Sequence, residues 1–151
     1  MKINMLIFLT LLPVLALLPG CGERDAYTGS VRVRVLDGLD STPIEGACVT
    51  VPETGERFLS RGDGRTDEML LPVIPDAEYD ALLPAECGRI TLLVTAEGYT
   101  PYLLLYARVR PNEARRIDVL MFPDDGTLPV FTVIEAPDAD WCGEFAERFM
   151  P

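Results

Sequence analysis

The sequence predicts an all-β fold, a seven-stranded antiparallel β-sandwich followed by a short C-terminal helix. Apolar and polar residues alternate in several runs, which is typical of strands that bury one face. Turn signals rich in glycine and proline separate these runs at short intervals. No segment with helical periodicity lies between them, so the sequence does not predict βαβ units or a parallel sheet.

The clearest strand lies at residues 30–36, where three valines alternate with two arginines. Because successive side chains of a strand point to opposite faces, we expect its valines to be buried and its arginines to face solvent. The other expected strands lie at residues 47–51, 57–60, 69–73, 90–96, 102–109 and 117–121. Five residues of these strands are expected at the centre of the core: Val33, Val49, Leu92, Val94 and Val119.

The segment at residues 74–87 fits no strand pattern. Asp76 is a suitable N-cap and Pro84 a suitable stop for a short helix between them. We expect this segment to cover one end of the sandwich. A functional loop is the alternative, because long loops on rigid scaffolds often carry function.

The C-terminal part is expected to add an edge strand at residues 129–134 and a helix at residues 138–149. Trp141, Phe145 and Phe149 recur at every fourth residue and therefore share one face of that helix. We expect this face to pack on the sandwich. The alternative is an exposed aromatic patch that binds a groove of a partner or a carbohydrate.

The N-terminal residues have the features of a bacterial secretory leader. Lys2 precedes an uncharged apolar run of 14 residues, Met5–Leu18. As a helix this run would reach about 21 Å, too short for a bilayer core of about 30 Å. The motif Leu18-Pro19-Gly20-Cys21 resembles the lipobox of bacterial lipoproteins, with Pro19 as its one departure from the usual pattern. An ordinary cleaved signal and an uncleaved anchor are the alternatives.

The lipobox resemblance implies a lipoprotein signal peptide at residues 1–20, acyl chains such as palmitate on Cys21, and a tether at residues 21–28. Two acyl chains anchor a protein firmly, whereas one chain alone is marginal. The expected location is therefore extracytoplasmic, in the outer membrane of a diderm host or on the outer face of the plasma membrane of a monoderm host. The membrane would be contacted through the lipidated cysteine.

Composition excludes several classes of function. Loss of residues 1–20 removes Lys2, the only lysine, so the net side-chain charge falls from −11 to −12. Such a charge argues against nucleic acid as a partner and against adsorption to anionic lipid beyond the anchor. The chain has no histidine, which excludes a histidine-based triad or zinc site. We expect no catalytic residue, no metal and no cofactor.

A group of acidic residues was weighed as a calcium site. Asp37, Asp40 and Glu45 share one loop, and Asp63 lies in a glycine-rich turn. Their spacing does not match an EF-hand loop. We interpret them as solvated turn residues.

Four segments together resemble the carboxypeptidase regulatory-like domain. They are residues 29–37, 42–51, 60–64 and 88–99, and the resemblance covers residues 29–122. Arg61 replaces an acidic residue of the family's turn, and Ile90 occupies an aromatic position. The resemblance implies a transthyretin-like (prealbumin-like) β-sandwich that serves as a non-catalytic accessory module, and it leaves residues 123–151 as an extension.

Three cysteines remain besides Cys21, namely Cys48, Cys87 and Cys142. An extracytoplasmic location permits a disulfide between two of them, and the sequence leaves the pairing open. A nucleophilic role is not expected, because no histidine is present to activate a thiol.

The sequence predicts a lipid-anchored binding or scaffolding module of the cell envelope. One alternative is a carbohydrate-binding module that uses exposed aromatic residues. A second alternative is an accessory subunit of an envelope enzyme or transporter. The expected partner is an envelope protein or a carbohydrate, and six aromatic residues are candidates for the contact surface: Tyr99, Tyr102, Tyr106, Trp141, Phe145 and Phe149.

Overall fold

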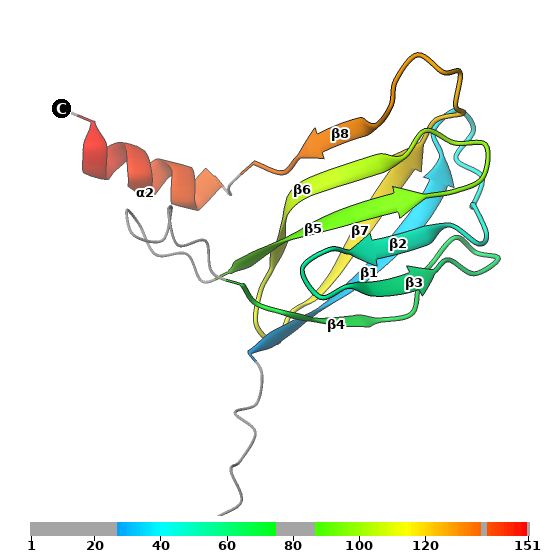
Figure 1. Ribbon diagram of the computed structural model, residues 1–151. Coiled ribbons are helices and arrows are strands. Elements are labelled where there is room, and N and C mark those ends of the chain that lie inside the picture. The colour runs from blue at the N-terminus through cyan, green and yellow to red at the C-terminus, as the bar shows by residue number, and fades with distance from the viewer. Residues whose placement is uncertain (1–26, 75–86, 137–138, 151) are drawn as a thin grey trace, which may run out of the picture.

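The computed structural model describes residues 27–74, 87–136 and 139–150 (Figure 1). Within these ranges the chain forms eight strands and one helix. In order, they are β1 (Thr28–Asp37), β2 (Cys48–Val51), β3 (Glu56–Leu59), β4 (Met69–Pro72), β5 (Gly88–Thr95), β6 (Tyr102–Val109), β7 (Ala114–Met121), β8 (Phe131–Ile134) and α2 (Ala139–Phe149). The seven strands predicted for the sandwich correspond to β1–β7.

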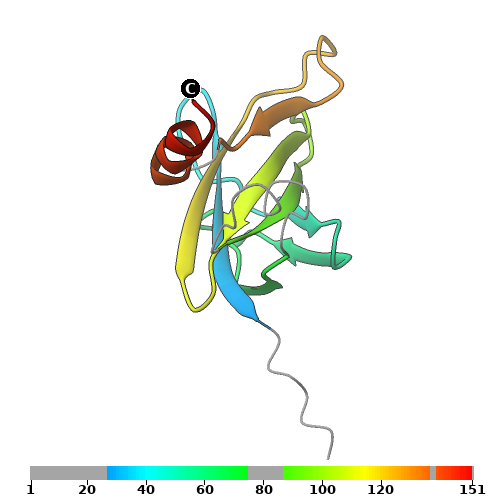
Figure 2. The same ribbon diagram turned by 90° about the vertical axis from the view of Figure 1, so that its left-hand side faces the viewer.

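The strands form two sheets that face each other (Figures 1 and 2). One sheet has three strands in the order β4-β1-β7, and the other has five in the order β3-β2-β5-β6-β8. The core lies between them. The five residues predicted for its centre, Val33, Val49, Leu92, Val94 and Val119, are all 0% exposed. The predicted β-sandwich and its alternation of buried and exposed side chains are therefore confirmed.

Two strand pairs correct the prediction of a wholly antiparallel sandwich. β7 pairs with β1 in parallel, and β8 pairs with β6 in parallel. β6 ends at the end of the sandwich where β1 begins, so β7 starts there and runs beside β1 in the same direction. β7 ends where β6 begins, which gives β8 and β6 their common direction.

The C-terminal extension forms the predicted edge strand and helix. β8 extends the five-stranded sheet beside β6, and α2 begins one residue after the expected start and ends at the expected residue. Figure 1 shows α2 standing beyond the end of the sheets. The helix predicted between Asp76 and Pro84 lies outside the described residues.

A bulge interrupts the pairing of β5 with β6. The register shifts between Ile90 and Leu92, and Tyr106 on the opposite strand has a φ of 60°. The backbone amide of Thr91, beside the shift, donates a hydrogen bond to the carboxylate of Glu53 at 2.8 Å. A positive φ is unusual for a bulky residue, so the surrounding sheet must hold Tyr106 in place.

Candidate functional site

A carboxylate just after β8 ties the two sheets together. Glu135 accepts hydrogen bonds from Arg108 Nε at 2.7 Å and from Arg115 Nη2 at 2.8 Å. Arg108 lies on β6 and Arg115 on β7, so the ion pairs join strands of different sheets. Arg115 Nη1 also donates to the carbonyl of Arg108 at 2.8 Å. This clamp fixes the point from which the chain continues into α2.

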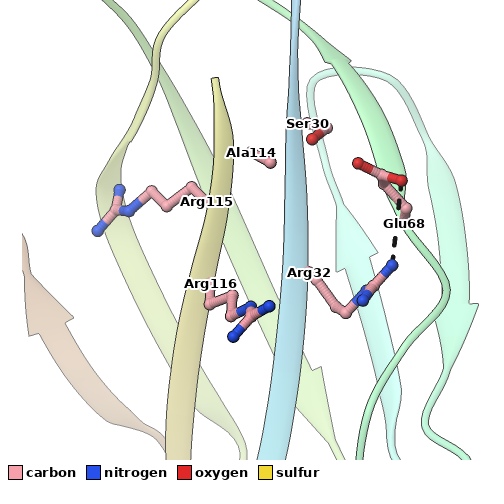
Figure 3. A pocket seen from close by; sticks show the side chains of 6 residues that line it. All are labelled: Ser30, Arg32, Glu68, Ala114, Arg115 and Arg116. Carbon is pink, nitrogen blue, oxygen red and sulfur yellow. Dashed lines mark ion pairs between the residues drawn. The ribbon is translucent and has the colours of Figure 1, made fainter. Parts of the chain in front are cut away.

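The outer face of the three-stranded sheet carries a row of arginines, and we call it the arginine face. Parallel register places Arg32 on β1 directly opposite Arg116 on β7, and Arg34 opposite Asp118. A hollow of about 380 Å³ lies at this point, between the first residues of the two strands. Its lining residues are Ser30, Arg32, Glu68, Ala114, Arg115 and Arg116. Figure 3 shows Arg116 beside β1, whereas Arg115 points to the other side of β7.

The arginine face is incompletely neutralised. Glu68 lies 3.9 Å from Arg32, and both side chains are about half exposed. No side chain in the described ranges pairs with Arg116. Arg34, predicted to face solvent, is half-buried, and its buried Nε has no hydrogen-bond partner among the described residues. Like charges directly opposite on neighbouring strands are destabilising, so Arg32 and Arg116 favour an anion above them.

The opposite end of the sandwich carries carboxylates that are held by hydrogen bonds. Asp37 accepts one from the amide of Leu39 at 2.7 Å and one from the Tyr99 hydroxyl at 2.8 Å. These bonds lower the pKa of Asp37, the Leu39 amide more strongly than the hydroxyl. The bond to Asp37 also raises the pKa of Tyr99, because it favours the protonated phenol.

Two of the other acidic residues considered as metal ligands, Asp40 and Asp63, serve local turns. Asp40 accepts from the amide and hydroxyl of Thr42, and Asp63 accepts from the amide and guanidinium of Arg65. The backbone amide of Arg65 is the main cause of the lowered pKa of Asp63. In the described part of the chain, no three histidine, cysteine or acidic side chains cluster as metal ligands would.

The structure separates the aromatic residues of the sandwich that the sequence offered as a contact surface. Tyr102 is only 8% exposed and packs in the core, so its assignment to a contact surface was wrong. Its inward position follows from the alternation of β6, in which Leu104 is also buried. Tyr99 is half-buried against Asp37. Tyr106 is exposed, with the guanidinium of Arg89 5.9 Å from its ring centre.

The aromatic residues of α2 share one face, on which Trp141 and Phe145 are half-buried and Phe149 is exposed. Trp141 and Phe145 are stacked with ring centres 5.0 Å apart, and Phe145 and Phe149 lie 4.6 Å apart. None of the helix residues is buried, and Phe149 is half exposed. The helix therefore forms as predicted with its aromatic face partly buried, and the packing of this face on the sandwich stays a prediction.

The three cysteines occupy different surroundings. Cys48 is half-buried on β2 as a free thiol, 3.8 Å from the hydroxyl of Thr50. Cys87 is half-buried just before β5, and Cys142 lies on the exposed helix. Disulfide formation and the lipidation of Cys21, which lies outside the described residues, stay predictions.

Sequence reasoning missed two features of this surface. Glu135 is one of many acidic residues in the sequence, and nothing in its neighbourhood marks it as a partner of Arg108 and Arg115. Arg116 lies in the pattern of an ordinary half-exposed strand. Only the parallel register places it opposite Arg32, and alternation alone carries no information on strand direction.

Comparison with known proteins assigns the chain to no family. No protein-family model matches the chain. No curated protein matches it either. The chain does resemble part of several solved structures at 10–16% identity, with TM-scores of 0.42–0.45.

Three of these structures illustrate the range. One is a candidate carbohydrate-binding protein from Bacteroides uniformis (10% identity, TM-score 0.43, 62% of this chain and 41% of that one). Another is a type II cohesin–X-dockerin complex from Acetivibrio cellulolyticus (14%, 0.44, 66% and 61%). A third is a candidate membrane-associated protein of unknown function from Bacteroides fragilis (14%, 0.42, 67% and 30%). In each case the match spans less than two-thirds of the solved chain.

Among the described residues, no helix is both long and apolar enough to cross a membrane.

Proposed function

We propose that this chain is a lipid-anchored, extracytoplasmic, non-catalytic binding module that contacts an envelope protein through the aromatic face of α2. The observation that carries the proposal is the incomplete burial of that face, in which Phe149 is exposed and Trp141 and Phe145 are half-buried. The leader and the lipobox-like motif ending at Cys21 support the anchor and the location. The order of motifs along residues 29–122 supports an accessory module of the carboxypeptidase regulatory-like type.

An aromatic helix face that is only partly buried favours a partner on energetic grounds. Aromatic side chains bury about 150–250 Å² each, which corresponds to several kcal/mol for the three rings at about 25 cal/mol per Å². Gly143 lies within the helix and weakens it by roughly 1 kcal/mol relative to alanine. An isolated helix of 11 residues is also marginal in water. Docking on a protein surface would bury the rings and stabilise the helix at the same time.

Carbohydrate binding is the weaker alternative. A sugar-binding platform needs ring faces that are free to stack on a sugar. In α2 the rings of Trp141 and Phe145 are stacked on each other, with 23° between their planes. On the sandwich, Tyr102 is buried and Tyr106 has a guanidinium over its ring. The surface therefore fits the apolar groove of a protein better than a sugar.

The proposal is tested by crosslinking in intact envelopes, with Trp141→Ala and Phe145→Ala compared against the unaltered protein. A central aromatic residue typically contributes 2 kcal/mol or more to an interface, so each change should reduce capture of a specific partner about 30-fold. Because both residues lie outside the sandwich core, the thermal unfolding midpoint of the domain should stay unchanged.

Glu147→Ala provides the matched control, since it lies on the same helix but outside the aromatic face. Capture that all three variants retain would contradict a role for the aromatic face. Specific retention of the protein on a polysaccharide matrix, lost in Trp141→Ala, would instead favour carbohydrate binding.

A further inference from the structure

The arginine face lies at the end of the sandwich from which the anchor would leave. Ser30, which lines the hollow, is the third residue of β1 and pairs with Leu70 on β4 and Ala114 on β7. Only the residues between Cys21 and Tyr27 separate a lipidated cysteine from the described fold. A chain of that length spans at most about 25 Å when fully extended. A lipid anchor would therefore hold this face within reach of a bilayer surface.

The charges of this face match phosphate groups. Arg32 and Arg116 lie opposite each other across β1 and β7, and the nearest acidic partner, Glu68, is 3.9 Å from Arg32. Guanidinium groups bind phosphate oxygens in a bidentate manner and are weakly hydrated, so they suit an interface of low polarity. Arg32 has only the long contact with Glu68, and Asp118 lies two residues further along β7, opposite Arg34. Both guanidiniums can therefore still bind an anionic headgroup.

Exposed apolar side chains accompany these charges. Leu70 is 69% exposed on the same outer face, beside Ser30, and Tyr27 is 63% exposed at the start of the fold. The carbonyl of Tyr27 accepts a hydrogen bond from the amide of Val73 at 2.8 Å, so its backbone is fixed next to β4. Arginines with a tyrosine and a leucine at one edge resemble the residues that proteins place at the headgroup level of membranes.

We propose that the arginine face rests on the bilayer surface. Arg32 and Arg116 bind phosphate groups of phospholipid headgroups, and the side chain of Leu70 inserts between neighbouring headgroups. The proposal rests on the lipid anchor at Cys21. It names a contact beyond the acyl chains, and it fixes which side of the sandwich faces the membrane. The five-stranded sheet then faces away from the bilayer.

The net charge of the chain does not prevent this contact. The hydrogen-bonded acidic residues Asp37, Asp40, Asp124 and Asp125 lie at the other end of the sandwich. Arg32 lies five residues before Asp37 on β1, so the two are roughly 17 Å apart, about two Debye lengths at physiological salt. The negative charge of the whole chain, which argues against adsorption to lipid, therefore does not give the local charge of the arginine face.

The acyl chains already hold the protein on the membrane. The contact of the arginine face therefore only has to orient the domain and does not have to bring it to the bilayer. Near an anionic bilayer, each arginine contributes about a fivefold preference. Together, Arg32 and Arg116 would favour the face-down orientation about 30-fold over other orientations. Salt should weaken this preference, since it screens exposed charges.

The test uses the full-length acylated protein in vesicles of phosphatidylcholine and phosphatidylglycerol. In a Trp141→Phe background, Leu70→Trp places the only indole on the arginine face. Leu59→Trp is the matched control, because Leu59 is 65% exposed on the five-stranded sheet. We expect lipids brominated near the headgroup to quench the Leu70→Trp emission and to leave the Leu59→Trp emission unchanged.

Removal of the arginine charges provides the second arm. Arg32→Gln with Arg116→Gln should abolish the quenching of the Leu70→Trp probe, as should high salt. Arg57→Gln with Arg61→Gln removes the same charge elsewhere and should leave the quenching intact.

Each outcome decides the proposal. Equal quenching of both probes, or of neither, in acylated protein overturns the face contact while the anchor stands. Protection of the Leu70→Trp probe in intact envelopes but not in vesicles would show that a protein covers the face, which also overturns it. Absence of labelled fatty acid from the protein refutes the anchor, and the face contact with it.

Discussion

Glu135 illustrates how a single residue can hold two elements that are far apart in sequence. Its side chain is 14% exposed, and the side chains of Arg108 and Arg115 are each 28% exposed. At this burial, hydrogen bonds between charged groups contribute more than they do on an open surface, because solvent screens them less. β8 and the chain leading to α2 depend on this contact for their position.

Glu135→Gln should therefore lower the free energy of unfolding by about 2 kcal/mol, since the change removes the negative charge that the guanidiniums of Arg108 and Arg115 share. Urea unfolding would measure the loss, and hydrogen exchange should show β8 amides opening first. Glu113→Gln is the control, because its contact with Arg110 is 3.7 Å long and half exposed. That change should stay within about 0.5 kcal/mol. Equal effects of the two changes would refute the clamp.

The bond between Tyr99 and Asp37 has a definite dependence on pH. Folding lowers the pKa of Asp37, so the stabilisation is present at neutral pH and is lost as the pH falls below about 4. Folding raises the pKa of Tyr99, so the stabilisation is also lost as the pH rises above about 10. Tyr99→Phe should lower the unfolding midpoint most near neutral pH, and the difference from the unaltered protein should narrow toward both extremes. A difference independent of pH would contradict this assignment.

At the scale of elements, the alternation of apolar and polar residues predicted where the strands lie but not whether neighbouring strands run parallel or antiparallel. Each run with period two became a strand, because a half-buried strand must place every second side chain in the core. The glycine-rich turn at residues 60–64 was equally readable. Gly64 has a φ of 75°, and a side chain there would lie 2.5 Å from the carbonyl oxygen of Val35. The parallel pairing of β1 with β7 was not readable, because pairing depends on where the chain crosses between sheets.

The candidate site was predicted less well than the strands. Tyr102 is expected at the surface because it is aromatic, although its position in β6 places it on the same buried side as Leu104. Conversely, the arginine face depends on Arg116, whose role appears only once β7 is placed beside β1. Contacts between elements distant in sequence carry the site, and local patterns do not record them.

The burial of the strands leads to a prediction about stability. Val49→Ala on β2 and Val94→Ala on β5 should each lower the free energy of unfolding by about 1–3 kcal/mol, since both side chains are fully buried and directly paired. Arg32→Ala on β1 should cost less than about 0.5 kcal/mol, because its side chain is 44% exposed and its one ion pair is long. Urea titrations of the three variants would show the contrast. Similar losses in all three would mean that the two faces of the strands have been misassigned.

At the scale of the whole molecule, net charge and surface charge give different information. A net charge of −11 indicates a self-repelling chain and argues against nucleic acid as a partner. It hides the grouping of Arg32, Arg34 and Arg116 on one outer face, where a hollow and an exposed leucine also lie. The aromatic face of α2 belongs to a different element from that surface. The proposed module would thus have separate surfaces for a membrane and for a protein.

The roles proposed for the arginine face and for the aromatic face of α2 both require a membrane-anchored protein. Cys21→Ser is therefore the decisive change for the whole molecule. Loss of the thiol removes the site of the thioether that would carry two acyl chains, and each buried CH₂ of those chains contributes about 0.8 kcal/mol. The variant should incorporate no labelled fatty acid, and it should either remain as an unprocessed precursor or leave the membrane fraction. Cys48→Ser is the matched control, because Cys48 lies within the sandwich and should leave labelling unchanged. Label retained by Cys21→Ser, or absent from the unaltered protein, would refute the lipoprotein assignment.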